Sequence, residues 1–514
     1  MRELGIFTDG TICAPATIPG TGAISIIRVS GEDSLAIAEK VIDVKGESLS
    51  ETEGYRLRYG TIFADDGSVL DNVIVSVFRA PHSYTGENSV EISCHASRFI
   101  VNAVLELLVN AGARIAAPGE FTRRAFVNGK MDLAQAEAVA DVIASQSAAA
   151  HRVAMNQLKG GFSSELKTLR EKLLTMTSLL ELELDFSEED VEFASRSELG
   201  ALVNEALAHI GRLTDSFSRG NAIKNGVPVA IVGATNTGKS TLLNALLGEE
   251  RAIVSDIAGT TRDTIEETLN LGGIMFRFID TAGIRETDEV VEKIGIERTF
   301  RKLNDASIVL GMTDLSRGED TVLSDAEYIW DKVNADASGR EFLLLVNKCD
   351  VDGIGLSAGE FVSNNASGEG HVAGYAGAGF AGVGSGAGYA DKAGKMARIE
   401  AALREKGIVT KMIPISAKTG SGLPELTETL AEIGRRITGD TDETLVTNIR
   451  HYEALSRAAT ALGRVRDGLK VATLPPDLIA QDLREALYHL GEIVGEISTD
   501  EVLGNIFRKF CIGK

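Results

Sequence analysis

The chain contains 514 residues, which exceeds the usual size of a single hydrophobic core and predicts about three domains. A hydrophobic fraction of 44% and a charged fraction of 25% are typical of soluble globular proteins, and no run approaches the ~20 apolar residues of a membrane span. The net charge of −22 opposes long-range attraction to phosphate backbones, so any contact with nucleic acid requires a local basic patch.

The amino terminus and the cysteines indicate a reducing compartment. The first residues include Glu3 and Asp9 and have no long apolar run behind a basic start, so they do not resemble a secretory signal. The four cysteines form neither a C-x-x-C pair nor a zinc pattern; they are Cys13, Cys94, Cys349 and Cys511. We expect a cytoplasmic protein with reduced, mostly buried thiols and no association with a membrane.

The first part of the chain favours strands. Short β-rich runs, such as residues 23–29 and 72–78, alternate with turns. This alternation predicts an α+β domain over residues 1–125.

Two later regions favour helices. Apolar residues recur at spacings of three and four between residues 133 and 219, and again between residues 448 and 514, where Pro475 and Pro476 interrupt them. We expect the two regions to pack together as one α-helical domain. Its predicted segments are residues 126–222 and 440–514, and the domain inserted between them covers residues 223–439.

The inserted region begins with the pattern of a phosphate-binding loop. An apolar strand at residues 229–232 leads into GATNTGKST, residues 233–241, which opens a helix. Glycines let backbone N–H groups surround a phosphate chain, Lys239 reaches the terminal phosphates and Ser240 is a ligand for Mg²⁺. The residues predicted to bind nucleotide through this loop are Asn236, Thr237, Gly238, Lys239, Ser240 and Thr241.

Three further motifs each follow an apolar strand. The strand at residues 274–280 ends in Asp280, which together with Thr281, Ala282 and Gly283 is expected beside Mg²⁺ and the γ-phosphate. The strand at residues 342–346 delivers Asn347, Lys348 and Asp350, and a carboxylate at Asp350 accepts two hydrogen bonds that guanine can donate and adenine cannot. A last strand, at residues 412–416, leads to the base-supporting Ser416, Ala417 and Lys418. The order predicts a multidomain protein with a Ras-like α/β (P-loop) G domain that binds GTP.

One position departs from many small GTPases. The residue after Gly283 is Ile284, whose apolar side chain cannot orient an attacking water. The polar group must come from elsewhere, and the nearby acidic candidates are Glu286, Asp288, Glu289 and Glu292. Asn236 could help to hold a monovalent cation that stabilises transition-state charge without an arginine from a partner.

A low-complexity tract interrupts this domain. Residues 354–395 are rich in glycine, alanine and serine and contain few bulky apolar side chains. We expect a surface loop; a clamp for a partner is the alternative.

The motifs together resemble the MnmE (TrmE) family of tRNA-modification GTPases over nearly the whole chain, except for the glycine-rich tract. The resemblance rests on IAGTTRD, DTAGIRE, IGIER, PGEFTRRAF, DLAQAEAVADVI and the terminal FCIGK. It implies a K⁺-dependent homodimeric GTPase that acts with the flavoprotein MnmG at the wobble uridine of tRNAs.

The family also implies roles for residues near the phosphates. K⁺ would be bound by Asn236, Ser255, Ile257 and Thr260, and Mg²⁺ by Ser240 and Thr261. Glu292 would be catalytic, because it would position the water. The segment between these ligands would be a GTP-binding switch loop formed by Ser255, Asp256, Ile257, Ala258, Gly259, Thr260 and Thr261.

The resemblance finally implies that the amino-terminal domain binds 5-formyl-tetrahydrofolate or a related folate. The matching positions are Arg28, Glu91, Lys130 and Lys514, where cations suit the glutamate tail and a carboxylate suits the pterin amine. Two departures from the family are Thr235 in place of proline, which loosens the P-loop turn, and CHASR at residues 94–98 in place of histidine followed by two glycines.

Two other functions are open to test. A ribosome-assembly GTPase switch without modification chemistry would need a basic RNA-binding module, whereas this chain is acidic. A folate-dependent aminomethyl transferase with a degenerate G domain conflicts with the intact nucleotide motifs. Folate binding by residues 1 to about 120 would discriminate the tRNA-modification GTPase from the ribosome-assembly switch.

Overall fold

The structure is a computed structural model, and it divides the chain into two compact units. It describes residues 10–185, 196–250, 267–279, 306–334, 340–350, 387–408, 410–439, 443–471, 475–497, 500–507, 510 and 513. One unit comprises residues 1–145, 151–217 and 444–514, and the other comprises residues 146–150 and 218–443. The second unit is therefore inserted in the first, and the predicted fold class is confirmed.

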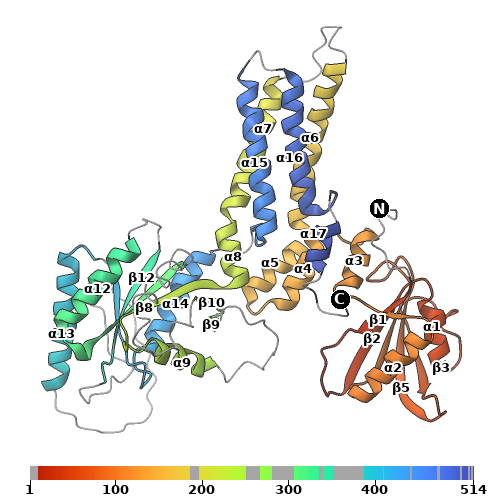
Figure 1. The fold of residues 1–514 in the computed structure, drawn as a ribbon, viewed down its shortest axis with the longest axis horizontal. Helices are drawn as coiled ribbons and strands as arrows, with labels where there is room; N and C mark the ends of the chain where they lie inside the picture. The colour runs from red at the N-terminus through yellow and green to blue at the C-terminus, as the bar shows by residue number, and fades with distance from the viewer. Residues whose placement is uncertain are drawn as a thin grey trace, which may run out of the picture. The chain divides into compact units, whose positions relative to one another are not determined.

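The amino-terminal part of the first unit is a seven-stranded sheet with the order β3-β4-β5-β6-β2-β1-β7 (Figure 1). Its strands are β1 (Ile12–Pro15), β2 (Ile24–Ser30), β3 (Ile42–Val44), β4 (Arg56–Phe63), β5 (Val69–Phe78), β6 (Ser89–His95) and β7 (Arg114–Ile115). Its helices are α1 (Ser34–Val41), α2 (Arg98–Asn110) and α3 (Glu120–Val127). In β5 the buried residues alternate as Val73, Val75 and Val77, so the sheet turns one face to a core that it shares with α1 and α2.

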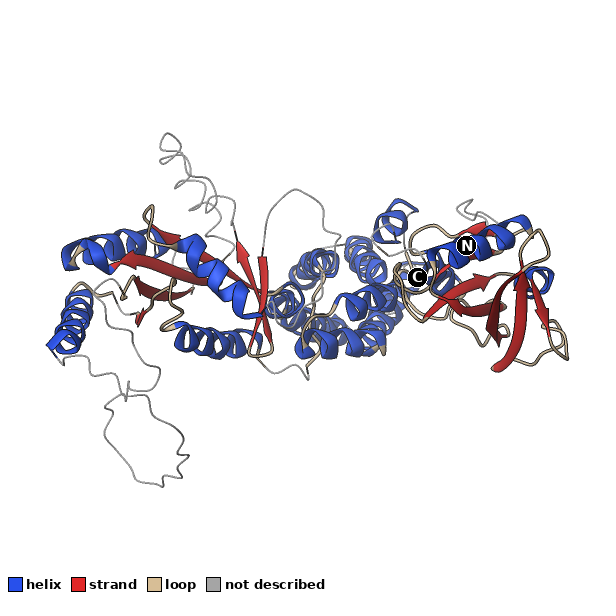
Figure 2. Cartoon of the chain, turned by 90° about the horizontal axis from the view of Figure 1, so that it is seen from below, coloured by secondary structure: helices blue, strands red, loops and turns tan. Residues whose placement is uncertain are grey.

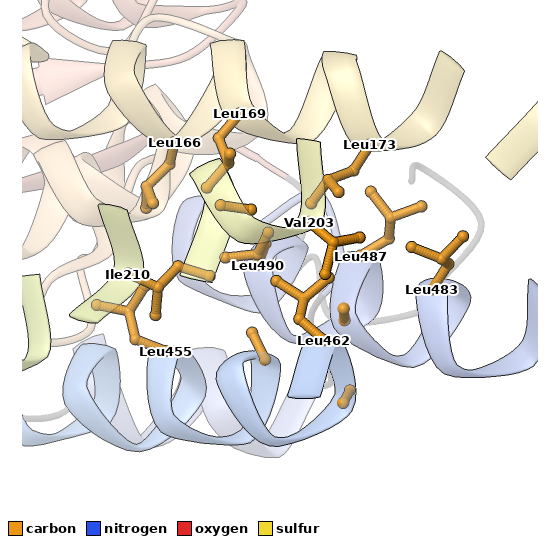
Figure 3. Close-up of a cluster of buried hydrophobic side chains, with 14 of the residues drawn as sticks. Leu166, Leu169, Leu173, Val203, Ile210, Leu455, Leu462, Leu483, Leu487 and Leu490 are labelled. Atoms are coloured by element: carbon orange, nitrogen blue, oxygen red, sulfur yellow. The ribbon is translucent and has the colours of Figure 1, made fainter. Parts of the chain in front are cut away.

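The helical part of the first unit is built from both ends of the insertion. Its helices are α4 (Leu133–Ala144), α5 (Ala148–Leu158), α6 (Gly161–Asp185), α7 (Arg196–Asp215), α15 (Ile449–Leu469), α16 (Pro476–Val494) and α17 (Asp500–Phe507). Leucines and valines of α6, α7, α15 and α16 interdigitate in one core (Figure 3). The predicted packing of the two helical regions against each other is confirmed. The predicted break in the second region at Pro475 and Pro476 is also confirmed, because α15 ends at Leu469 and α16 begins at Pro476.

The chain leaves and re-enters this helical part at adjacent points. The backbone N–H of Val446 donates to Oγ of Ser216 at 3.0 Å, which joins the return segment to the residue that follows α7. Nε2 of Gln157 donates to the carbonyl of Leu445 at 3.1 Å, and Oγ1 of Thr444 donates to Oε1 of Glu165 at 2.7 Å. The return segment is thus held by hydrogen bonds before α15 begins.

The inserted unit is a six-stranded sheet with helices on both faces (Figure 2). Its strands, in the order β13-β12-β11-β8-β10-β9, are β8 (Val227–Gly233), β9 (Glu267–Leu271), β10 (Ile274–Ile279), β11 (Ile308–Asp314), β12 (Glu341–Asn347) and β13 (Lys411–Pro414). Its helices are α8 (Phe217–Asn225), α9 (Lys239–Glu250), η3 (Leu315–Arg317), α12 (Glu319–Asn334), α13 (Ala387–Glu405) and α14 (Leu423–Thr438). In β8, Val229 and Ile231 face one apolar cluster while Ala230 and Val232 face another, which is why this strand reads as an uninterrupted apolar run.

Within the part of the chain that the structure describes, no helix is long and apolar enough to cross a membrane. The same residues contain no group of three or more His, Cys, Asp or Glu side chains arranged to hold a metal ion. Cys13, Cys94 and Cys349 are buried thiols that form no disulfide among the described residues, and burial raises the pKa of Cys13 to about 11. Cys511 lies outside the described residues.

Candidate nucleotide-binding site

Three of the four predicted nucleotide motifs lie in described residues, and they meet at one edge of the inserted sheet. β8, β11, β12 and β13 are parallel neighbours, so their carboxyl ends share an edge. In open α/β sheets this edge is where ligands bind. The predicted phosphate-binding loop follows β8. Asn347 is the last residue of β12, and Lys348 and Asp350 follow it. Ser416 lies two residues beyond β13.

The loop between β8 and α9 has the backbone of a phosphate cradle. Asn236 and Gly238 adopt left-handed conformations, with φ of 61° and 99°, which turn the chain sharply before the helix begins. Nζ of Lys239 donates to the carbonyls of Gly233 and Ala234, both at 2.8 Å. Burial lowers the pKa of Lys239, so an anionic ligand at the helix N-terminus would stabilise its charged form.

Asn347 joins three segments of the site. Its Nδ2 donates to the carbonyl of Thr237 at 2.6 Å, and its Oδ1 accepts from the N–H of Ala417 at 3.0 Å. Asn347 and Thr237 are buried, so each contact also satisfies polar groups that water does not reach. The residue therefore fixes the P-loop against the segments that would bind the base.

Gly238 gives the most local test of this geometry. A Cβ built on Gly238 would lie inside contact distance of Nδ2 of Asn347, and the left-handed backbone disfavours any side chain. We expect Gly238→Ala to weaken GDP binding by about tenfold or more, measured by fluorescence titration, since one lost hydrogen bond plus strain exceeds about 1.4 kcal/mol. Gly248→Ala is the matched control, because a Cβ at exposed Gly248 meets nothing within 4 Å. Equal affinities of the two variants would contradict the assigned packing.

The residues predicted to bind the base are also arranged together. Oγ of Ser416 donates to Oδ1 of Asp350 at 2.7 Å and accepts from the N–H of Thr419 at 3.2 Å. Ser416 and Ala417 are buried, whereas Lys418 is exposed. Ser416 fixes the rotation of the carboxylate that is predicted to read guanine.

Sequence reasoning missed one residue of this edge, Asp314. It ends β11 directly opposite Asn347 on β12, and its Oδ2 accepts a hydrogen bond from Nζ of Lys348 at 2.7 Å. The burial of Asp314 opposes its ionisation, but hydrogen bonds from Lys348 and Ser316 more than offset this and lower its pKa. The available signal was a carboxylate at the end of an apolar strand, the position that Asp280 also holds.

Several predicted residues lie outside the described parts of the chain. Ser240 and Thr241 are described and occupy the first turn of α9. The residues outside are Ser255, Asp256, Ile257, Ala258, Gly259, Thr260, Thr261, Asp280, Thr281, Ala282, Gly283, Ile284, Glu286, Asp288, Glu289, Glu292 and Lys514, together with most of the glycine-rich tract, up to residue 386.

Two predicted folate residues form a pair in the amino-terminal sheet. Arg28 on β2 lies opposite Glu91 on β6, and its Nε and Nη2 donate to Oε1 of Glu91 at 2.9 and 2.8 Å. The guanidinium also lies over the rings of Tyr84 and Phe121, at 5.1 and 5.6 Å from their centroids. The pair is partly buried, so it offers both a cation and a carboxylate at one place on the sheet.

The carboxyl-terminal tail reaches this sheet. A Cβ on Gly513 would overlap the carbonyl oxygen of Pro15 at the end of β1, so only glycine permits this approach. β1 pairs with β2, which carries Arg28. Nζ of Lys130 donates to the carbonyl of Pro81 at 2.9 Å, in the loop that also carries Tyr84.

The CHASR departure is accommodated by the local backbone. Gly22 donates its N–H to the carbonyl of Ala96 at 3.4 Å, and a Cβ on Gly22 would lie 3.7 Å from that of Ala96, an ordinary contact. Nδ1 of His95 lies 2.7 Å from Oδ1 of Asp71, whose other oxygen accepts the backbone N–H of His95 at 2.8 Å.

Comparisons with known proteins cover the whole chain. A model of the MnmE helical domain matches residues 133–511, and a model of the GTP-binding protein TrmE N-terminus matches residues 11–130. The chain is 48% identical to the tRNA modification GTPase MnmE of Parabacteroides distasonis over 98% of this chain and 100% of that protein. It is 49% identical to the protein of the same name from Bacteroides fragilis, over 98% of this chain and 99% of that protein. It is 46% identical to the one from Flavobacterium johnsoniae, over 99% of this chain and 100% of that protein.

Proposed function

Because the chain belongs to the MnmE family of tRNA modification GTPases, we propose that it is a K⁺-dependent GTPase that acts in the cytoplasm as a homodimer. With MnmG it would use a folate one-carbon unit in carboxymethylaminomethyl or aminomethyl modification of the wobble uridine of tRNAs. The observation that carries the GTP part is Asn347, which ties the P-loop to the segment that orients Asp350.

The described residues fit a guanine nucleotide with its phosphates at α9. The P-loop backbone and Lys239 would bind the β- and γ-phosphates, and Asp350 with Ser416 would bind the base. Ser240 with Thr261 would hold Mg²⁺, with Asp280 nearby, and bound metal ions would neutralise charge that develops on the phosphate oxygens.

We also propose the K⁺ ligands and the catalytic residue that the family implies. Asn236 supports this assignment because it is exposed in the P-loop and is held left-handed, so its amide is available at the loop surface. Ser255, Ile257 and Thr260 would complete the K⁺ site, and Glu292 would orient the attacking water.

The folate proposal rests on the amino-terminal sheet. Arg28 and Glu91 form one half-buried pair, and Gly513 brings the tail against β1, two features that support a site shared by the sheet and Lys514. Because Arg28 and Glu91 are hydrogen-bonded to each other, they would contact the same end of the folate, where Glu91 would accept from the pterin amine and Arg28 would hold that carboxylate in place. Lys130 would add a cation for the folate glutamate tail.

Steady-state GTP hydrolysis in KCl and in NaCl at equal ionic strength tests the proposal. We expect a rate about tenfold or more higher in KCl, and we expect this excess to rise with protein concentration, because K⁺ would stabilise transition-state charge between paired G domains. Asn236→Gly should remove the difference, since glycine keeps the left-handed backbone but lacks the amide. Asn244→Ala, at an exposed position of α9, is the control and should retain the parental response. Equal parental rates in both salts would favour a generic GTPase switch.

A further inference from the structure

An ion pair next to the base-binding segment is unexplained by the roles assigned so far. Nζ of Lys348 donates to Oδ2 of Asp314 at 2.7 Å. Asp314 is 4% exposed, and its position opposite Asn347 places it on the strand beside the predicted guanine site. A buried carboxylate at a ligand edge suggests a role in the site, since an apolar side chain would be the cheaper filler.

The local contacts hold this carboxylate in one orientation. Its Oδ1 accepts from the backbone N–H of Ser316 at 3.0 Å and from Oγ of Ser316 at 2.6 Å, at the start of η3. Its other oxygen, Oδ2, is thereby directed to Lys348. Asp314 therefore acts as a fixed anchor for a cation.

Lys348 needs such an anchor. Its backbone is left-handed, with φ of 62°, a conformation that costs free energy for a residue other than glycine. It is also only two residues from Asp350, the carboxylate predicted to read guanine. A mobile Lys348 ammonium could pair with Asp350 and compete with the base, because opposite charges within about 4–6 Å attract strongly.

We propose that Asp314 is a positioning residue for guanine binding, because it holds the Lys348 ammonium against β11 and leaves Asp350 free for the base. This inference rests on the proposed guanine site, and it adds a specificity-determining residue on a strand that contributes none of the motifs.

Asp314→Asn tests the inference because asparagine keeps the shape and the acceptor for Ser316 but presents an amide to Lys348. We expect KM for GTP to rise about tenfold with kcat at saturating GTP unchanged, since the altered contact lies at the base and not at the phosphates. Asp331→Asn, exposed on α12, is the matched control and should keep the parental KM. If Asp314 had only a structural role, Asp314→Asn would lower kcat and the melting temperature together, without a selective rise in KM.

A second substitution tests the route of the effect. If Asp314 acts through Lys348, adding Asp314→Asn to Lys348→Met should leave KM where Lys348→Met alone places it. An equal further rise in that background, or a parental KM for Asp314→Asn, would overturn the proposal. If Asp314→Asn fails to fold, the double variant replaces it: a KM equal to that of Lys348→Met supports the proposal, and a further rise overturns it. Loss of the proposed function itself is distinct, because the parental protein would then show no saturable GTP hydrolysis.

Discussion

Asp350→Asn is expected to weaken GTP binding by about 100-fold and to make xanthosine triphosphate the preferred nucleotide. Ser416 donates to Oδ1 of residue 350, so an asparagine there would keep its carbonyl toward Ser416 and turn its amide N–H groups toward the base. Guanine presents N–H donors at that position. They would face the N–H donors of the asparagine amide, so neither set would have an acceptor. Xanthine presents a carbonyl acceptor instead, which the amide can satisfy.

Competition of GTP and xanthosine triphosphate against a fluorescent GDP measures this exchange. Asp320→Asn, at an exposed position in the first turn of α12, makes the same chemical change away from the site and should alter neither affinity. An unchanged preference for GTP in Asp350→Asn would show that another group reads the base.

Glu137→Gln is expected to lower the free energy of unfolding of the helical part by about 3 kcal/mol at pH 7. Glu137 on α4 is only 10% exposed and accepts from Nε and Nη2 of Arg450 at 2.9 and 3.0 Å. Nε2 of the buried His451 lies 2.7 Å from Oε2 of Glu137, the oxygen that also accepts from Nη2 of Arg450. A neutral amide would leave these groups buried without the anion that compensates them.

The same cluster predicts a pH dependence. Burial by itself would raise the pKa of Glu137, but the charges and hydrogen bonds of His451 and Arg450 lower it from 4.5 to about 2. A lowered folded-state pKa contributes stability above the unfolded value, which is lost as the pH falls from about 4.5 towards about 2. Glu137→Gln should remove this part of the acid sensitivity.

Native-state hydrogen exchange of amides in α4 and α15 measures both effects, since it reports on this part of the chain separately. Glu181→Gln is the matched control, because Glu181 accepts from Arg484 at 2.6 Å in an exposed pair that is worth at most about 1 kcal/mol. Equal protection in the Glu137 and Glu181 variants would show that the buried cluster does not stabilise the helices.

The sequence predicted features whose signals are local. The P-loop, the strand before it and the two helical regions each lie in one continuous pattern, and the structure has them where the patterns predicted. The strand predicted at residues 412–416 ends earlier, since β13 covers Lys411–Pro414, although the N–H of Ile415 still donates to the carbonyl of Val346 at 2.8 Å. Ser416 instead forms an isolated bridge with Ser421.

The missed features depend on pairings between distant residues. Glu137 and Arg450 are 313 residues apart, and neither position carries a pattern that identifies its partner. Asp314 and Lys348 meet only because β11 and β12 are parallel in a given register. Such contacts follow from the assembled fold, so periodicity and motif spacing could not show them.

The hydrogen bond between Ser216 and Val446 has a consequence for synthesis on the ribosome. The chain is synthesised from its amino terminus, so α6 and α7 leave the ribosome before α15 and α16 are made. During that time Leu173 and Val203 lack the side chains of α15 and α16 against which they pack. Residues 218–443 must be translated, and have time to fold, during that interval. Because the folded insert brings its two ends close together, it reduces the entropy lost when the late helices close on the early ones. The inserted unit would thus assist the assembly of the helices that surround it.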